Sequence, residues 1–245
     1  MKKLKTLNDI FIKAFLNEVL PKMDLNEKST LLDLGCGQQP YRYLYENMVG
    51  HMVSTDIDKR GSGINCFSDA HKLPFKANSF DAIIMCEVLE HLIDPKASLA
   101  EAKRILKRNG HIIITWPFIY NIHEIPYDFY RITEFGIEKL LKHNHLKVVK
   151  FMRRGNVIAV LITILCQLAM GLLEALKRIP FTGFIFKPLS EIFTFIIQSS
   201  LRIFFFILKK AKKLNLDIIG TGLAGPMGTL SLWTLGYCVV ARKNN

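Results

Sequence analysis

The stretch TLLDLGCGQQP, residues 30–40, decides the fold. It begins as an apolar, strand-like run and ends in a turn with two glycines, Gly35 and Gly37, which let the backbone turn tightly and approach a ligand closely. A dinucleotide site would have a third glycine and a helix N-terminus, whereas this loop continues into Pro40. The acid Asp33 stands just before the turn and suits a cationic ligand better than a phosphate.

Strand-like and helix-like segments alternate after this turn. The helical segment Pro95–Lys107 separates the last two of the next four strands, and Thr133 is placed to cap a later helix. Such alternation predicts a parallel, doubly wound α/β sheet with its ligands at the carboxyl ends of the strands. The expected strands after the first are HMVSTD (51–56), GINCF (63–67), FDAIIMC (80–86), GHIIITW (110–116), HLKVVKFM (145–152) and LGYCVVAR (235–242).

Four motifs occur in order between residues 29 and 152. They are D-x-G-x-G at 33–37, the acid Asp56 at the end of the second strand, the block SDAHKLPF…SFDAIIMCEVLEHLIDP at 68–95, and LKRNGHIIITWP at 106–117. Together they resemble the class I S-adenosylmethionine-dependent methyltransferases, in particular the methyltransferase type 11-like proteins found with bacterial surface-polysaccharide genes. The resemblance implies a Rossmann-like, doubly wound, seven-stranded and mostly parallel sheet, with S-adenosylmethionine as the cofactor.

The resemblance also implies a role for individual residues. Asp33, Gly35, Cys36 and Gly37 would surround the methionine end of the cofactor. The remaining cofactor-binding residues would be Asp56 at the ribose, Ile57 and Ala70 beside the adenine, Asp69 at the adenine amino group, and Cys86 and Glu87 beneath the sulfonium.

Methyl transfer to a hydroxyl group needs positioning and the removal of a proton. The segment between the fifth strand and the helix capped by Thr133 resembles the P-Y-D-x-x-R-x-T block of those bacterial proteins, and its polar and aromatic side chains suit a sugar-like acceptor. We predict His123 and Asp128 as its catalytic residues, with the alternatives that Asp128 only pairs with Arg131 and that His91 only orders its loop. Glu87, Glu90 and His91 resemble a metal-binding cluster of small-RNA 2′-O-methyltransferases, in which a later histidine is the fourth ligand. However, E-x-x-E-H is common in metal-free relatives, and we predict no metal.

The run VIAVLITILCQLAMGLL, residues 157–173, carries no charge. Residues 139–213 hold fourteen Lys and Arg against two acids, which accounts for the whole net charge of +12. Because these basic residues border apolar segments and no exposed aromatic platform, the pattern favours anionic lipid over RNA or DNA. We expect helices that lie in the membrane interface, flanked by Arg153-Arg154, Lys177-Arg178 and residues 209–213. A hairpin of 157–173 with 192–208 that spans the membrane, or a buried cap or dimer surface, are the alternatives.

These observations predict four regions: an N-terminal amphipathic helix (1–28) with Leu7, Ile10, Phe11, Ala14 and Phe15 on one side, the cofactor-binding core (29–152), an apolar and basic helical insertion between the last two strands (153–234), and the last strand (235–245). The insertion should leave the sheet beside the active site. We expect a methyltransferase, peripheral on the cytoplasmic face of the cell membrane, that O-methylates an amphipathic or lipid-linked saccharide. The alternatives are a soluble, quinone or lipid acceptor with the insertion as a dimer or lid element, and a membrane scaffold that binds S-adenosylmethionine without catalysis.

Overall fold

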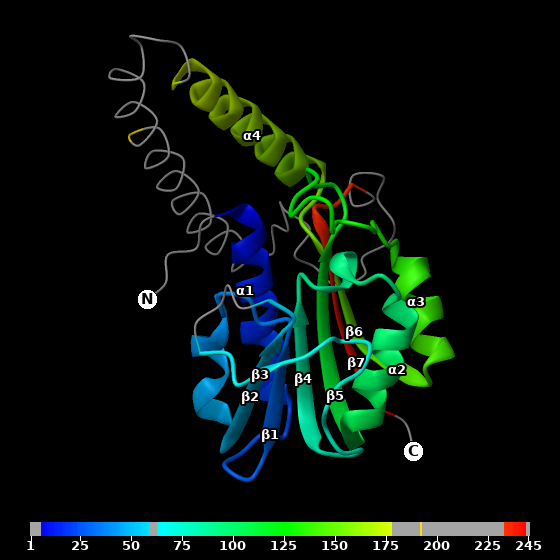
Figure 1. Cartoon of the computed structure of the whole chain (residues 1–245). Coiled ribbons are helices and arrows are strands. Elements are labelled where there is room, and N and C mark those ends of the chain that lie inside the picture. Colours follow the sequence, from blue (N-terminus) through cyan, green and yellow to red (C-terminus); the bar gives the residue numbers. More distant parts are fainter. Residues whose placement is uncertain (1–5, 59–62, 178–191, 193–232, 244–245) are drawn as a thin grey trace, which may run out of the picture. The chain divides into compact units, whose positions relative to one another are not determined.

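The computed structural model describes residues 6–58, 63–177, 192 and 233–243, and the chain divides into two compact units (Figure 1). One unit contains residues 12–153 together with the strand that begins at Gly236. The other contains residues 154–235 and the start of the N-terminal helix up to Phe11.

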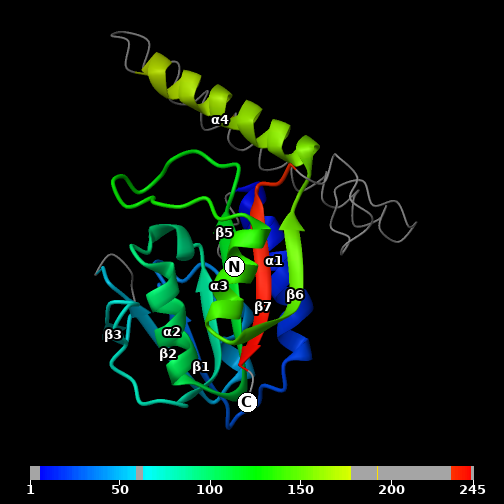
Figure 2. The same cartoon turned by 90° about the vertical axis from the view of Figure 1, so that its right-hand side faces the viewer.

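Seven strands of the described chain form one sheet in the order β3-β2-β1-β4-β5-β7-β6 (Figure 2). Strands β1 to β5 pair in parallel, and β7 runs antiparallel to β5. The predicted Rossmann-like, mostly parallel sheet is therefore confirmed. The strands are β1 (Thr30–Leu34), β2 (His51–Asp56), β3 (Cys66–Phe67), β4 (Phe80–Cys86), β5 (Leu106–Pro117), β6 (Leu146–Arg154) and β7 (Gly236–Lys243).

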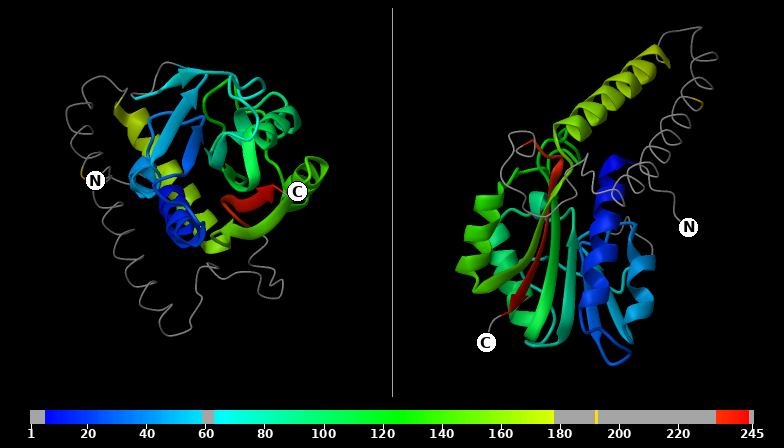
Figure 3. Two further views of the ribbon diagram at one scale, coloured as in Figure 1. Left: turned by 90° about the horizontal axis from the view of Figure 1, so that it is seen from below. Right: turned by 180° about the vertical axis from the view of Figure 1, so that it is seen from behind.

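The central strands are continuous apolar runs because both of their faces are covered. Helices α2 (Pro95–Ile105) and α3 (Glu134–His143) lie on one face of the sheet, and α1 (Leu7–Val19) from Ile12 onward lies on the other (Figure 3). The core beneath α2 and α3 is formed by fully buried side chains such as Ile83, Ile112 and Ile114. Single 3₁₀ turns complete the unit: η1 (Leu20–Lys22), η2 (Arg42–Leu44), η3 (Glu46–Met48) and η4 (Leu89–His91).

Capping side chains set where these helices begin. Asp94 accepts a hydrogen bond from Ala97 N at the start of α2, and Thr133 accepts one from Gly136 N at the start of α3, as expected for Thr133. Helix α2 ends two residues before the predicted Lys107, because Leu106 is fully buried and pairs with Phe80 of β4. Helix α1 also differs from the prediction, since Ala14 is exposed while Ile12 is buried.

The described part of the second unit is dominated by α4 (Val157–Lys177). The Asn156 side chain accepts hydrogen bonds from the backbone of Ile158 and Ala159 and so caps its first turn. Among the described residues, none of the helices is both long enough and apolar enough to span a membrane. The predicted partner segment 192–208, apart from Ile192, and the basic cluster 209–213 lie outside the described residues.

The structure corrects the expectation that Arg153 and Arg154 meet lipid headgroups. The Arg153 guanidinium binds both carboxylate oxygens of Glu134 at 2.6 and 2.7 Å. The Arg154 side chain is 0% exposed. A basic residue contributes to binding at a surface only when solvent reaches its charge, so these two arginines do not form a basic flank.

Candidate active site

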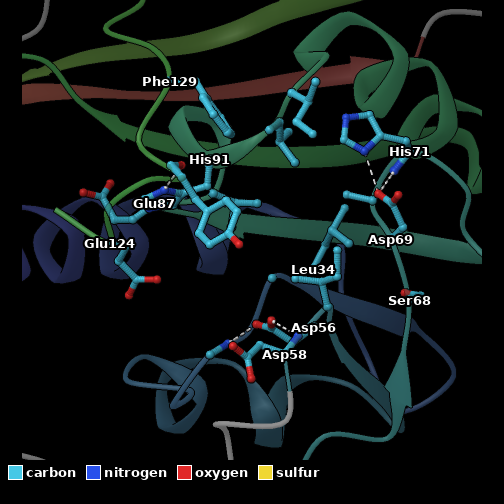
Figure 4. A pocket seen from close by; sticks show the side chains of 18 residues that line it. Leu34, Asp56, Asp58, Ser68, Asp69, His71, Glu87, His91, Glu124 and Phe129 are labelled. Atoms are coloured by element: carbon cyan, nitrogen blue, oxygen red, sulfur yellow. Dashed lines mark hydrogen bonds and ion pairs between the residues drawn. The ribbon is translucent and has the colours of Figure 1, made fainter. Parts of the chain in front are cut away.

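A cavity of about 510 Å³ lies at the carboxyl ends of β1, β2 and β4. This is the position where parallel α/β sheets bind ligands, and the volume is typical of small-molecule sites. Figure 4 shows Asp56 and Asp58 from the end of β2 on one side of it, and Asp69 with His71 on another. Its lining consists of Leu34, Gly35, Gly37, Asp56, Ile57, Asp58, Ser68, Asp69, Ala70, His71, Glu87, Val88, His91, Leu92, Ile93, Glu124, Tyr127 and Phe129.

The glycine turn after β1 meets two different requirements. Gly35 has φ +70°, and a Cβ atom there would lie 2.5 Å from Val88 Cγ2, so the position excludes any side chain. Gly37 has φ +47°, but a Cβ atom there would meet no atom within 4 Å, because the backbone opens onto free space. Cys36, between them, is buried and does not line the cavity. The lack of a side chain at Gly37 thus leaves space for a ligand, whereas the lack of a side chain at Gly35 allows the turn to pack against Val88.

Asp33 lies behind the cavity wall and does not line it. Its carboxylate accepts a hydrogen bond of 2.6 Å from the Tyr45 hydroxyl, and only 3% of the residue is exposed. Burial raises the pKa of Asp33 to about 6, partly offset by the hydrogen bond from Tyr45. A positive charge nearby stabilises the ionised form of such a buried acid, and the cationic ligand expected here would supply that charge.

Asp56 ties the ends of β1 and β2 together. Its Oδ2 accepts a hydrogen bond of 2.8 Å from Gly37 N, and its Oδ1 accepts one of 3.0 Å from Asp58 N. Each carboxylate oxygen can accept more than one hydrogen bond, so both remain able to bind a ligand hydroxyl. The next residue, Ile57, is 76% exposed at the cavity, which leaves its apolar surface free to contact a flat ring.

Asp69 is held by its neighbour His71. The Asp69 Oδ1 atom accepts hydrogen bonds from His71 N at 2.8 Å and from the imidazole Nδ1 at 2.6 Å. The His71 Nε2 atom accepts a hydrogen bond from Asp94 N at 3.1 Å, which places the imidazole proton on Nδ1. These hydrogen bonds to the charged form lower the pKa of Asp69. Its Oδ2 therefore stays available as an acceptor in the cavity, next to Ala70.

The end of β4 contributes Cys86 and Glu87. Burial raises the pKa of the Cys86 thiol well above its usual value, and the side chain does not line the cavity. Glu87 lines it in a left-handed conformation, with φ +55°, and accepts a hydrogen bond of 2.8 Å from the Thr115 hydroxyl. Glu124, also at the cavity, has φ +49°. Such strained positions are concentrated at functional sites.

The segment from Phe118 to Thr133, which we call the acceptor loop, is hydrogen-bonded to the η4 turn. The Glu90 carbonyl accepts hydrogen bonds from Phe129 N and Tyr130 N, and His91 Nδ1 lies 2.8 Å from Tyr127 O. Near the far end of the loop, Trp116 Nε1 donates to Ile132 O at 2.7 Å. These ties place Glu124, Tyr127 and Phe129 at the cavity.

The acceptor loop brings the two predicted catalytic residues together. The Asp128 Oδ2 atom lies 3.1 Å from His123 Nδ1 and accepts a hydrogen bond from His123 N. Arg131 binds both Asp128 oxygens, and this pairing lowers the pKa of Asp128 to about 2. Neither His123 nor Asp128 lines the cavity, and His123 Nε2 lies 3.7 Å from Glu90 Oε1. The role of His123 as a base stays a prediction.

Glu90 is a deeply buried ionisable group at the edge of the cavity. It is 1% exposed, and its two carboxylate oxygens find no hydrogen-bond partner among the described residues. Burial raises its pKa. The carboxylate in turn raises the pKa of His123, which faces it. Glu90, His91 and His123 thus form one cluster at the edge of the cavity.

Several lining residues were not predicted as site residues from the sequence, namely Leu34, Asp58, Ser68, His71, Val88, His91, Leu92, Ile93, Glu124, Tyr127 and Phe129. His71, the side chain that orients Asp69, lies two residues from the predicted Asp69-Ala70 pair. The sequence could have indicated this role, because an imidazole two residues after an aspartate can donate a hydrogen bond to its carboxylate. Val88 carried no such signal, because its contact with Gly35 bridges residues 53 positions apart.

Comparison with known proteins gives the site a family context. Residues 32–114 match the family described as "Methyltransferase domain". An uncharacterised protein of Methanocaldococcus jannaschii is 29% identical over 164 residues, which is 64% of this chain and 60% of that protein. The demethylmenaquinone methyltransferase of Thermotoga maritima is 30% identical over 95 residues, 34% of this chain and 42% of that protein. The chain spans about half the length of other curated relatives that it matches.

The structural comparison concerns the fold. Phosphoethanolamine N-methyltransferase 2 of Haemonchus contortus, solved in complex with S-adenosyl-L-methionine, superposes with a TM-score of 0.52 and 14% identity, over 95% of this chain and 53% of that protein. The cavity fits the same cofactor, because Gly37 opens onto free space and Asp56 and Asp69 each keep a free acceptor position. Residues 32–114 therefore match a methyltransferase domain, and the sheet that contains them has the Rossmann-like fold of S-adenosylmethionine-dependent methyltransferases.

Proposed function

We propose that the protein transfers a methyl group from S-adenosylmethionine to a hydroxyl group of an amphipathic acceptor, such as a lipid-linked saccharide. The observation that carries the proposal is the composition of the cavity. Its lining combines the glycine turn and the carboxylates of Asp56 and Asp69 with exposed apolar surface of Ile93, Tyr127 and Phe129. A cavity lined by both polar and apolar groups suits an acceptor that has both a hydroxylated and an apolar part.

The residues of the chain have separate tasks in this proposal. The cofactor supplies an already activated methyl group on a sulfonium. Asp56 and Asp69 hold its polar groups, and the free space at Gly37 admits it. Since the methyl group needs no further activation, the protein contributes alignment of the acceptor and removal of its proton. His123, oriented by Asp128, is our candidate base within the cluster at the edge of the cavity.

The exposed face of α4 supports a membrane-associated acceptor. Leu161, Leu165, Leu168 and Leu172 follow one another at helical spacing, and each is 54–65% exposed. A row of exposed leucines is costly in water, and burial in a lipid interface recovers that cost. Because Arg153 and Arg154 are not available to headgroups, we propose that apolar burial dominates the binding, on the cytoplasmic face of the membrane.

A quinone is the second candidate acceptor. The match to a demethylmenaquinone methyltransferase favours it, and the apolar residues that line the cavity would suit a prenylated ring equally well. The two candidates differ in the atom that receives the methyl group and in the lipid fraction that contains the product.

The test is methylation of extracted membrane lipids by the purified protein. Parent protein and S-adenosylmethionine bearing a labelled methyl group are incubated with glycolipid and quinone fractions, followed by measurement of S-adenosylhomocysteine and of product mass. We expect one labelled methyl group in the glycolipid fraction, and much less labelled product with Gly37→Val. Label in the quinone fraction would select the second candidate. If the parent produced no S-adenosylhomocysteine beyond the Gly37→Val level with either fraction, the proposal would be rejected in favour of a non-catalytic cofactor-binding protein.

A further inference from the structure

Three side chains with metal-ligating atoms meet at the edge of the cavity. Glu90 and His91 come from the η4 turn, and His123 comes from the acceptor loop. Their ligand atoms all lie within 4.8 Å of one another. Glu90 is buried, and its carboxylate has no hydrogen-bond partner among the described residues. A buried carboxylate without a partner is costly, and a cation bound between it and the two imidazoles would offset that cost.

The hydrogen bonds of the two imidazoles show which nitrogen atoms face that carboxylate. The His91 Nδ1 atom lies 2.8 Å from the Tyr127 carbonyl oxygen, which can only accept, so this nitrogen carries a proton. The His123 Nδ1 atom lies between the Asn121 carbonyl and the Asp128 carboxylate, two further acceptors. In both neutral imidazoles the lone pair is therefore on Nε2, the nitrogen that faces Glu90.

The distances distinguish a metal ion from a shared proton. From Glu90 Oε1, His91 Nε2 lies 3.6 Å away and His123 Nε2 lies 3.7 Å away. Both separations are too long for hydrogen bonds. Ligands of a tetrahedral ion at about 2.0–2.2 Å stand about 3.4 Å from one another, close to these separations. The contacts of Nδ1 with a carbonyl and a carboxylate are also the outer interactions that orient metal-binding histidines.

We propose that Glu90, His91 and His123 bind one divalent transition-metal ion of the Zn²⁺ class. Two imidazoles and one carboxylate leave at least one coordination position open, which is the arrangement of reactive rather than purely structural sites. Because His91 also lines the cavity, an oxygen atom of a bound molecule can take that position.

Two consequences follow for the site. The ion joins the acceptor loop to the η4 turn, because His123 belongs to one and Glu90 and His91 belong to the other. The ion also changes the role of His123, whose Nε2 becomes a ligand and no longer a base. The ion would instead lower the pKa of a hydroxyl group bound to it, so that this group releases its proton to solvent water. This last use rests on the proposed function, whereas the binding of the metal does not.

The test measures metal binding in the absence of cofactor and acceptor. Protein freed of metal with EDTA is titrated with Zn²⁺ by calorimetry and with Co²⁺ by visible absorption. We expect one ion per chain and a Co²⁺ spectrum of nitrogen and oxygen ligands. Loss of an outer partner of a metal ligand weakens affinity about 10–100-fold, so Glu90→Gln, His91→Ala and His123→Ala should each weaken it on the order of 100-fold or more. His51→Ala, at an exposed position at the start of β2, is the matched control and should bind as the parent does.

A second measurement separates loss of ligation from misfolding. In metal-free protein, Glu90→Gln removes a buried charge and should melt at or above the temperature of the parent. Zn²⁺ should raise the melting temperature of the parent and slow chymotryptic cleavage of its acceptor loop, but should do neither in Glu90→Gln. The proposal is overturned by the absence of saturable binding, by equal affinity in the ligand variants and His51→Ala, or by a thiolate-to-Co²⁺ band that places the ion on cysteines. With any of these outcomes, His123 returns to its role as candidate base and the proposed methyl transfer is unaffected.

Discussion

Replacing Gly35 and Gly37 separately should affect different properties of the protein. At Gly35 a methyl group meets Val88 Cγ2 at 2.5 Å and Cγ1 at 2.9 Å, and Val88 cannot turn away easily because it is branched at Cβ. A left-handed conformation costs an alanine about 1–2 kcal/mol. Overpacking adds about 1–3 kcal/mol, so Gly35→Ala should lower the free energy of unfolding by about 2–5 kcal/mol. At about 2–4 °C per kcal/mol, the melting temperature falls by about 4–20 °C.

Gly37→Ala has only the conformational cost, about 1–2 kcal/mol, because no atom lies within 4 Å of the new methyl group. The larger Gly37→Val should lower the affinity for S-adenosylhomocysteine about tenfold or more, about 1.4 kcal/mol, since its side chain occupies cavity space. Thermal unfolding measures the first quantity and calorimetry the second. Adding Val88→Ala to Gly35→Ala should restore the part of the free energy of unfolding that overpacking had removed. A double-mutant cycle measures this part as the interaction energy of the two positions.

Two results would refute this reasoning. One is equal loss of stability in Gly35→Ala and Gly37→Ala, which would mean that contact with Val88 has no energetic effect. The other is unchanged cofactor affinity in Gly37→Val, which would place the ligand away from the turn and remove the basis for assigning the cavity to S-adenosylmethionine.

Three further predictions concern other parts of the chain. Burial raises the pKa of Asp33 from 3.8 to about 6, so the folded state holds this proton more tightly and stability falls as pH rises from about 4 to 6. A rise from 3.8 to about 6 corresponds to about 3 kcal/mol, so the free energy of unfolding of Asp33→Asn, measured with denaturant, should fall over this pH range by about 3 kcal/mol less than that of the parent. An identical pH dependence of the two proteins would contradict the raised pKa. Asp56→Ala should weaken cofactor binding by about 1.5–3 kcal/mol in calorimetry through loss of a charged acceptor, while Glu46→Ala, at a partly exposed ion pair, should bind normally. Leu165→Glu with Leu168→Glu should reduce sedimentation with anionic vesicles at every salt concentration without changing cofactor affinity, whereas undiminished sedimentation would show that this face of α4 does not contact lipid.

Patterns of neighbouring residues were enough to predict the sheet. The runs HMVSTD and FDAIIMC became β2 and β4 without a change of bounds, and Thr133 caps its helix, because short apolar runs and capping residues act within a few positions of the chain. The same local information placed Gly37, Asp56 and Asp69 at one end of the sheet, since parallel strands bring their carboxyl ends together.

Only the tertiary structure decided which predicted residues reach the cavity and what they face. Asp33 turns to Tyr45, twelve positions away, and is buried behind the wall. His123 faces Glu90, and Arg154, expected at a lipid surface, is fully buried. None of these pairings follows from periodicity, because each depends on the packing of segments that are distant in the chain. The sequence determined which elements form and where their ends gather, whereas burial and long-range contact determined the charge, the partner and the accessibility of each side chain there.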